Sequence, residues 1–230
     1  MEQETKQGHL CIAIDGPAGA GKSTVAKALA KRLGIRHLDT GAMYRAMALA
    51  AIRSGVDPSD EPAMARLLDR TDIRVAFTKE GQRVSISGED VTGDIRTPQI
   101  SMAASLVGVH PCVRKKLVAL QQQVAREYAV VMDGRDITTV VLPDTPYKFF
   151  ITASPEVRAE RRYKELVERG DTKATFDEVL AEIVRRDHND TTRAYTPMLV
   201  AEDALVIDTS DMTVEQALDR MLERIREVEG

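Results

Sequence analysis

Residues 11–34 read CIAIDGPAGAGKSTVAKALAKRLG, an apolar run followed by a glycine-rich turn and a helical pattern. The apolar residues from Leu10 to Ile14 predict a strand, and the spacing from Lys22 to about Leu33 predicts a helix. Between them, residues 16–23 fit the pattern G-x-x-x-x-G-K-[ST]. Glycines at these positions let backbone N–H groups turn inward around an anion, and the helix N-terminus adds positive potential. The segment therefore predicts a phosphate-binding loop.

The polar residues of this loop have separate expected roles. Lys22 is expected to reach the β- and γ-phosphates of a bound nucleotide, and Ser23 to ligate Mg²⁺. Asp133 ends the apolar strand AVVM, where phosphate-loop proteins place a carboxylate that helps to hold Mg²⁺. An aspartate that only caps the next turn is an equally good interpretation. The expected ATP-binding residues of the loop are Gly16, Pro17, Ala18, Gly19, Ala20, Gly21, Lys22, Ser23 and Thr24.

Strand and helix patterns alternate along much of the chain. Besides the first strand, β-branched runs at 36–38, 129–133, 147–152 and 204–208 predict four more. Helical patterns follow them, and Ser154 and Pro155 are typical of an N-cap and a first helical position. This alternation predicts an α/β fold, a five-stranded parallel sheet with helices on both faces. In such folds ligands gather beyond the carboxyl ends of the strands.

Two segments interrupt this alternation. After a short helix at 62–69, the stretches DIRVAF and QRVSIS alternate with period two around residues 79–81 and predict a β-hairpin. Antiparallel strands within a parallel alternation indicate an insert beside the core. A second lobe is expected at 156–193, two helices joined by RGDTKATF. The expected division is a core of residues 8–54, 110–155 and 194–230, an insert at 55–109 and a lid at 156–193.

The composition argues against several classes of protein. The 230 residues include 32 Lys and Arg and 36 Asp and Glu, a net charge of −4, and no Trp, which disfavours nucleic acid as the main partner. Cys11 and Cys112 have no paired spacing, so neither a disulfide framework nor a zinc site is indicated. No apolar stretch resembles a membrane span or a signal peptide. We therefore expect a cytoplasmic protein with small-molecule partners and no membrane partner.

A nucleotide held by the phosphate loop can pass its terminal phosphoryl group to an acceptor, and the sequence restricts which acceptor this is. The guanine-reading motif Asn-Lys-x-Asp and the transporter signature Leu-Ser-Gly-Gly are both absent, which favours a small metabolite kinase. Arginines recur in LDTGAMYR at 38–45, MDGRD at 132–136 and VRRDHNDTTR at 184–193. Transfer between two nucleotides gathers negative charge, which guanidinium groups and Mg²⁺ can stabilise. Acidic residues balance the arginines of 156–193, so a solvated face with salt bridges is the competing interpretation there.

With these segments in view, the chain resembles the bacterial cytidylate kinases nearly from end to end. The resemblance rests on IDGPAGAGKST, LDTGAMYR, GEDVTGDIRTP, AASLVGVHPCVR, VMDGRDITTVVLPD, ASPEVRAERR and EIVRRDHNDTTRA. It implies a phosphate-loop (P-loop) kinase core with a nucleoside-monophosphate-binding insert and a mobile helical lid. It also implies transfer of the γ-phosphoryl of ATP to CMP or dCMP with Mg²⁺, in a protein expected to be a monomer.

The resemblance also assigns roles to individual residues. Those expected to contact CMP are Arg45, Arg135 and Arg193 at its phosphate, Ser105, Arg114 and Asp136 at the cytosine, Arg186 and Asp190 at the ribose, and Thr40 and Tyr44 beside them. Arg158 and Arg162 are expected to reach ATP from the lid, with Arg161 as a neighbour. The expected catalytic residues are Lys22, Arg135, Arg162 and Arg193, and the expected metal ligands are Ser23 and Asp133.

Some alternatives stay open at this point. Tyr44 on an apolar helix face is also compatible with the core, and Ser105 with helix packing. Thr40 stands where a serine is common in the family, and residues 188–189 and 191–192 stand where charges are common. Competing functions are a kinase for UMP, AMP or shikimate, and a regulatory P-loop ATPase.

Overall fold

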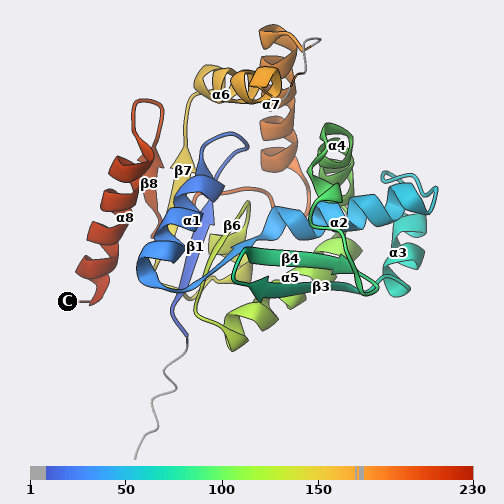
Figure 1. The fold of residues 1–230 in the computed structure, drawn as a ribbon, viewed down its shortest axis with the longest axis horizontal. Helices are drawn as coiled ribbons and strands as arrows, with labels where there is room; N and C mark the ends of the chain where they lie inside the picture. The colour runs from blue at the N-terminus through green and yellow to red at the C-terminus, as the bar shows by residue number, and fades with distance from the viewer. Residues whose placement is uncertain (1–8, 169, 171–173, 230) are drawn as a thin grey trace, which may run out of the picture.

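The computed structural model describes residues 9–168, 170 and 174–229, and a parallel sheet lies at its centre (Figure 1). The sheet has the order β2-β6-β1-β7-β8, and every pair within it is parallel. Its strands are β1 (Cys11–Asp15), β2 (Arg36–Asp39), β6 (Val130–Gly134), β7 (Lys148–Thr152) and β8 (Leu205–Asp208). The prediction of five parallel strands in an α/β fold is confirmed.

Alternate residues of β1 and β6 enter two different cores. Ile12 and Ile14 of β1 pack with helices α1 (Lys22–Leu33) and α8 (Val214–Glu229) on one face. Ala13 faces the other side, where α5 (Pro111–Glu127) and a π-helical turn, η2 (Ile137–Val141), cover the sheet. Both faces are thus buried, as the continuous apolar composition of the parallel strands requires.

The register of the central strands brings polar residues to one edge. Asp15 pairs with Gly134 across β1 and β6, and Asp39 pairs with Asp133 across β2 and β6. Because parallel strands end at the same edge, three carboxylates and the phosphate loop lie together beyond their carboxyl ends. This edge faces the two helices at the top of Figure 1.

The insert packs against α2 (Thr40–Arg53). It contains α3 (Glu61–Asp69), β3 (Ile73–Thr78), β4 (Gly81–Ile86), β5 (Glu89–Asp90), η1 (Asp94–Arg96) and α4 (Pro98–Val107). The predicted hairpin is confirmed, and the two residues of β5 extend it to an antiparallel sheet of order β3-β4-β5. Met47 and Leu49 of α2 share one core with Leu67, Val84 and Ile100 of the insert, which explains why α2 is apolar on most of its surface.

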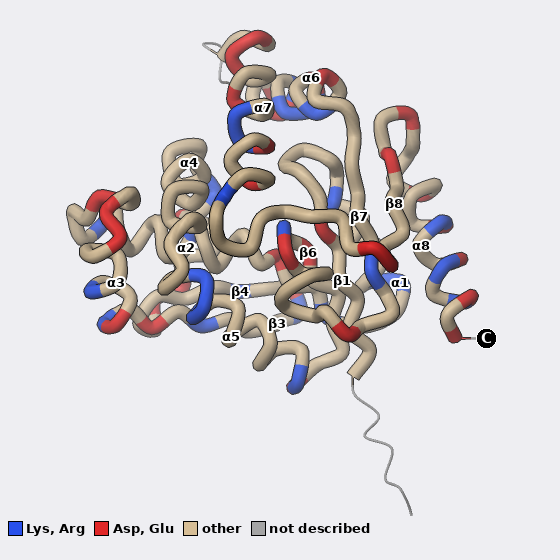
Figure 2. The backbone as a smooth tube through the Cα atoms, turned by 180° about the vertical axis from the view of Figure 1, so that it is seen from behind, with Lys and Arg blue, Asp and Glu red and all other residues tan. Residues whose placement is uncertain are grey.

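Two helices form the remaining lobe, α6 (Pro155–Glu168) and α7 (Phe176–Thr192). They pack through Ala159, Val179 and Ile183. The Ser154 hydroxyl accepts a hydrogen bond from the N–H of Val157 at 3.3 Å, so the expected cap is present. In the connection RGDTKATF, residues 169 and 171–173 lie outside the described residues. Figure 2 shows acidic and basic residues interspersed along α7 and α8.

Within the described ranges, 9–168, 170 and 174–229, we find no helix with the length and apolar character needed to cross a bilayer.

Candidate active site

The phosphate loop runs from the end of β1 to the start of α1. Gly16 has φ +141°, and a Cβ atom there would lie 1.9 Å from the carbonyl oxygen of Ile151, so only glycine fits this position. Gly21 caps α1 in a left-handed conformation without a side-chain hydrogen bond, and the first turn of α1 holds no acidic residue. The N–H groups of this helix end are therefore open to an anion.

Lys22 is the first residue of α1, and its side chain folds back over the phosphate loop. Its Nζ donates a hydrogen bond to the carbonyl of Pro17 at 2.5 Å, and the side chain is buried. Burial, and then the nearby Arg135 guanidinium, lower the pKa of Lys22 to about 7. An anion bound in the loop would offset both causes by stabilising the ammonium form.

Ser23 and Asp133 come together as the sequence predicted. The Ser23 hydroxyl donates to Asp133 Oδ2 at 2.6 Å, and His37 Nε2 lies 2.7 Å from Oδ1. Burial opposes ionisation of Asp133, but the hydrogen bonds from His37 and Ser23 hold the pKa of its carboxyl below the usual value. A hydroxyl and a carboxylate next to a phosphate loop are the oxygen donors that Mg²⁺ prefers, so the residues fit this ion. His37, on an edge strand, carried no recognisable signal in the sequence.

All ten residues expected at CMP line one cavity of about 260 Å³. They come from α2, α4, α5, the end of β6, and α7 with the residue that follows it. They are Thr40, Tyr44, Arg45, Ser105, Arg114, Arg135, Asp136, Arg186, Asp190 and Arg193. The structure therefore gathers residues that are up to 153 positions apart, from Thr40 to Arg193, around a single space. We call this space the acceptor cavity.

Three arginines that line the acceptor cavity have N–H groups that are not hydrogen-bonded to any described residue. Arg45 Nε, Arg186 Nε and Arg193 Nη2 are buried and have no hydrogen-bond partner within the described part of the chain. The carboxylate near Arg193 Nη2 is Asp136, whose Oδ1 is 4.0 Å away and too far for a hydrogen bond. Burial and then neighbouring guanidinium groups lower the pKa of Arg186 and of Arg193. A bound anion would relieve both the unpaired donors and the repulsion.

Carboxylates orient the remaining guanidinium groups. Asp39 Oδ2 accepts from Arg45 Nη2 at 2.6 Å, and Asp190 Oδ2 accepts from Arg135 Nε at 2.8 Å. These ion pairs fix one side of each arginine while other N–H groups stay available. Asp39, which the sequence analysis did not assign, also caps α2 by accepting from the N–H of Ala42.

The far end of the cavity is closed by a buried ion pair. Arg114 Nη2 donates to Asp136 Oδ2, and the two residues are 2% and 4% exposed. Arg114 Nη1 donates to the carbonyl of Gly108 at 3.1 Å, and the guanidinium lies 5.4 Å from the centre of the Tyr44 ring. Ser105, also on this wall, donates to the carbonyl of Ser101 at 3.4 Å. Tyr44 thus faces the cavity, although it is also part of the helix packing.

Asp15 is a further site residue that the sequence analysis missed. This carboxylate is fully buried and accepts hydrogen bonds from the N–H of Ile137 at 2.8 Å, the N–H of Thr138 at 2.7 Å and the Thr138 hydroxyl at 2.6 Å. It therefore anchors the segment directly after Asp136 to the strand that leads into the phosphate loop. Burial raises the pKa of Asp15 to about 6, although the bonds from Thr138 and Ile137 oppose the shift.

A second cavity, of about 550 Å³, lies between the phosphate loop and the lid helices. We call it the donor cavity. Arg161 and Arg162 line it, together with Lys22, Ser23 and Thr24. Arg158 does not line it: the side chain is buried, bonds both oxygens of Asp187, and donates to the carbonyl of Ala18 at 3.2 Å. Although Arg158 and Arg162 share a helix face, only Arg162 reaches this cavity in the structure.

The donor and acceptor cavities meet at the phosphate loop. Residues that line both include Lys22, Ser23, Asp39, Arg45 and Arg186. Anions bound in the two cavities would therefore lie next to each other. Lys22, Arg45 and Arg186 would surround them, with Ser23 and Asp133 close by. This arrangement suits transfer of a phosphoryl group between two phosphorylated molecules, because it stabilises charge and needs no strong base.

The chain is similar to known proteins over nearly its whole length. A family model described as cytidylate kinase matches residues 12–227. The cytidylate kinase of Pelotomaculum thermopropionicum is 53% identical over 215 residues, covering 93% of this chain and 95% of the relative. That of Bacillus subtilis is 48% identical over 218 residues, covering 95% and 97%. A crystal structure of an uncharacterised protein from Eubacterium ventriosum shares the fold, with 16% identity, a TM-score of 0.52 and coverage of 95% and 99%.

Proposed function

The chain belongs to the cytidylate kinase family, and from this premise we propose how its two cavities divide the reaction. It is an ATP-dependent phosphotransferase that acts on CMP. ATP binds with its phosphates in the loop of residues 16–24 and extends into the donor cavity. CMP or dCMP binds in the acceptor cavity with its phosphate toward Lys22. A phosphate oxygen of the acceptor attacks the γ-phosphorus, the bond to the β,γ-bridging oxygen breaks, and CDP or dCDP and ADP result.

The observation that carries this division is the set of unpaired arginine donors in the acceptor cavity. Arg45 and Arg193 each keep a buried N–H group without an acceptor among the described residues, and Arg135 adds a guanidinium held by Asp190. A phosphate monoester dianion supplies the oxygens and the charge that these groups lack. We assign these three arginines to the acceptor phosphate, and Arg186 and Asp190 to the ribose.

Catalysis in this proposal is electrostatic. Lys22, Arg135, Arg162 and Arg193 stabilise the charge that develops on the transferring group and the leaving oxygen. Burial lowers the pKa of Lys22 to about 7, and bound phosphates favour its ammonium form, so it acts as a cation in the loaded enzyme. Arg162 reaches the donor from the lid, which also excludes water that would otherwise accept the phosphoryl group.

We assign Mg²⁺ to Ser23 and Asp133. Their hydroxyl and carboxylate oxygens are the hard donors this ion requires, and the bound ion would supply positive charge that neutralises the phosphates of ATP. His37 positions the Asp133 carboxylate from the opposite side.

Base recognition is assigned to Arg114 and Asp136, with Ser105 beside them. Cytosine presents an amino donor at C4 and an acceptor at N3, whereas uracil presents a carbonyl and an N–H. A carboxylate only accepts and a guanidinium only donates, so this pair complements cytosine.

The test is a panel of acceptors in a coupled ADP-release assay with Mg·ATP. CMP and dCMP should be phosphorylated with kcat/KM at least about 30-fold above that for UMP, since two mismatched hydrogen bonds each cost roughly 1–3 kcal/mol. AMP and shikimate should be poor acceptors. Failure of both CMP and dCMP, or ATP hydrolysis stimulated by RNA, would overturn the assignment.

The finer expectations about the assembly also belong to this proposal. We infer a cytoplasmic monomer that acts on free nucleotides, with neither nucleic acid nor membrane as a partner. The net charge of −4 and the absence of Trp support this inference. The separate small core of α6 and α7 supports the lid at 156–193, whereas the insert at 55–109 shares its core with α2 and α5. Light scattering of the purified chain measures the oligomeric state directly.

A further inference from the structure

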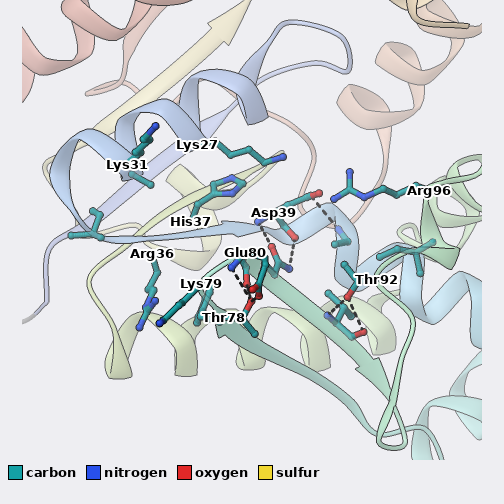
Figure 3. Close-up of a pocket in the computed structure, with 18 residues that line it drawn as sticks. Lys27, Lys31, Arg36, His37, Asp39, Thr78, Lys79, Glu80, Thr92 and Arg96 are labelled. Atoms are coloured by element: carbon teal, nitrogen blue, oxygen red, sulfur yellow. Dashed lines mark hydrogen bonds between the residues drawn. The ribbon is translucent and has the colours of Figure 1, made fainter. Parts of the chain in front are cut away.

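A third cavity, of about 470 Å³, lies beside α1 and the β3–β4 hairpin (Figure 3). It lies between α1, β2, the β3–β4 hairpin and η1. It shares Lys27, Asp39 and Arg96 with the donor cavity, and of these only Asp39 also lines the acceptor cavity. The nucleotide assignments above leave this space unused. We call it the hairpin cavity.

Basic side chains dominate its wall. Five basic residues line it and have no ion-pair partner within the described part of the chain. They are Lys27, Lys31, Arg36, Lys79 and Arg96. Among the described residues, two carboxylates line the same space. Asp39 accepts a hydrogen bond from Arg45 at 2.6 Å. Glu80 accepts from the Thr78 hydroxyl at 2.7 Å and lies 3.9 Å from the guanidinium of Arg83. Five unpaired cations thus face two carboxylates that already have partners, in a protein whose net charge is −4.

The cations come from different elements and surround an apolar floor. In Figure 3, Lys27 from α1 and Arg96 from η1 point toward one another across the space, while Arg36 and Lys79 lie at the hairpin end. The floor includes Ile35, Phe77 and Val84, and the guanidinium of Arg36 lies 5.8 Å from the centre of the Phe77 ring.

We propose that the hairpin cavity is a second anion site, which binds an oligophosphate either bare or carried on a small organic group. Several cations that lack partners are matched by a ligand with several charges, because each phosphate oxygen gains a charge-assisted hydrogen bond and repulsion between the cations falls. The apolar floor gives an organic group a surface on which to pack. Since Lys27 and Arg96 also line the donor cavity, the occupant weakens the binding of ATP by competing for these two cations.

The test measures binding of inorganic tripolyphosphate by calorimetry, without Mg²⁺, to enzyme saturated with ADP and CMP so that the two reacting sites are filled. One further binding event is expected. The double variant Lys31→Gln/Lys79→Gln should weaken it at least about tenfold, since each lost contact to phosphate contributes on the order of 1 kcal/mol. Neither lysine lines the donor or acceptor cavity, so activity with ATP and CMP should be unchanged.

Lys115→Gln/Arg220→Gln is the matched control. It removes the same two charges from exposed residues on α5 and α8 that line none of these cavities, and binding should stay within about twofold of the original. GTP in place of tripolyphosphate separates the two forms of ligand, since tighter binding of GTP indicates packing of an organic group on the floor. Absence of any binding to the filled enzyme, or equal weakening in both double variants, would overturn the proposal.

Discussion

At the residue scale, the buried pair of Arg114 and Asp136 makes base choice testable. Asp136→Asn should lower kcat/KM for CMP yet narrow the preference for CMP over UMP by about tenfold, because the new amide can turn its NH₂ toward the uracil carbonyl. Arg114 still opposes the N3–H of uracil, so the change is partial. Breaking a buried ion pair also destabilises the fold, but the ratio of kcat/KM for two acceptors does not depend on the folded fraction. An unchanged ratio would show that Asp136 does not read the base.

Asp15 offers a second prediction at this scale, in the pH dependence of stability. Its pKa rises on folding from 3.8 to about 6, so its contribution to stability is full in acid and is lost as the pH rises through 6. Asp15→Asn removes this titration and, at every pH, one acceptor for the bonds from residues 137 and 138. Between pH 4.5 and 7.5, the unfolding free energy of the wild type should fall relative to the variant by roughly 2 kcal/mol. Urea unfolding at the two pH values measures it, and a pH-independent difference would contradict the shift.

The sequence identified the residues to which the loop motif or the family resemblance assigns a role. It did not identify the residues that hold other side chains in place. The loop motif placed Lys22 and Ser23, and the resemblance placed all ten residues that line the acceptor cavity. Asp15 and Asp39 lie within the quoted segments and His37 lies beside one, but none of the three was assigned a role. Their partners Thr138, Asp133 and Arg45 meet them only in the folded chain, through the register of β1, β2 and β6 or within the first two turns of α2.

At the scale of elements, one side chain fastens the hairpin to the core beside the site. Gln82 of β4 accepts from the N–H of Asp39 at 2.7 Å and donates to its carbonyl at 3.1 Å. Figure 3 draws these bonds at the end of β2. Asp39 in turn orients Arg45, so the position of the insert is coupled to the acceptor phosphate.

Gln82→Met should therefore raise KM for CMP several-fold while KM for ATP stays within about twofold, and lower the unfolding free energy by about 1–3 kcal/mol for the two lost hydrogen bonds. The side chain keeps its length but can no longer form these bonds. Gln123→Met is the matched control, since Gln123 is exposed on α5 and its side chain donates to Glu127 at 2.8 Å, away from the acceptor cavity. Equal changes in both KM values would mean that Gln82 contributes to stability alone.

Among the elements that the sequence did not predict, β5 and η2 lack a periodic pattern of their own. The two residues of β5 are too short for alternation to be recognised, and its pairing with β4 depends on the tertiary fold. The π-helical turn η2 is held at its start by Asp15, more than 120 positions earlier in the chain. By contrast, the hairpin alternates with period two and the five parallel strands are apolar runs of several residues, and all of these strands were predicted within one or two residues of their ends.

At the scale of the whole molecule, ligand charge should draw the lobes together. Arg162 on α6 and Arg186 on α7 face the phosphate loop across the donor cavity, and Arg193 follows α7 at the acceptor cavity. Arg158 already ties α6 to the loop through Ala18, and to α7 through Asp187. The lid is thus connected to the core through arginines, and two of them, Arg186 and Arg193, have an N–H group without a partner in the described chain.

Closure is therefore predicted on binding of a non-hydrolysable ATP analogue together with CMP. Phosphate oxygens that bond arginines of the lid and of the core at once make opening of the lid more costly, so amide hydrogen exchange in α6 and in the second half of α7 should slow at least about tenfold. Helix α8 is the internal control, because it packs on the opposite part of the sheet and contributes no residue to either cavity. CMP alone should slow exchange less than both ligands together, since the donor phosphates engage Arg162. Equal slowing in α8, or none in α6 and α7, would mean that binding stabilises the molecule without closing it.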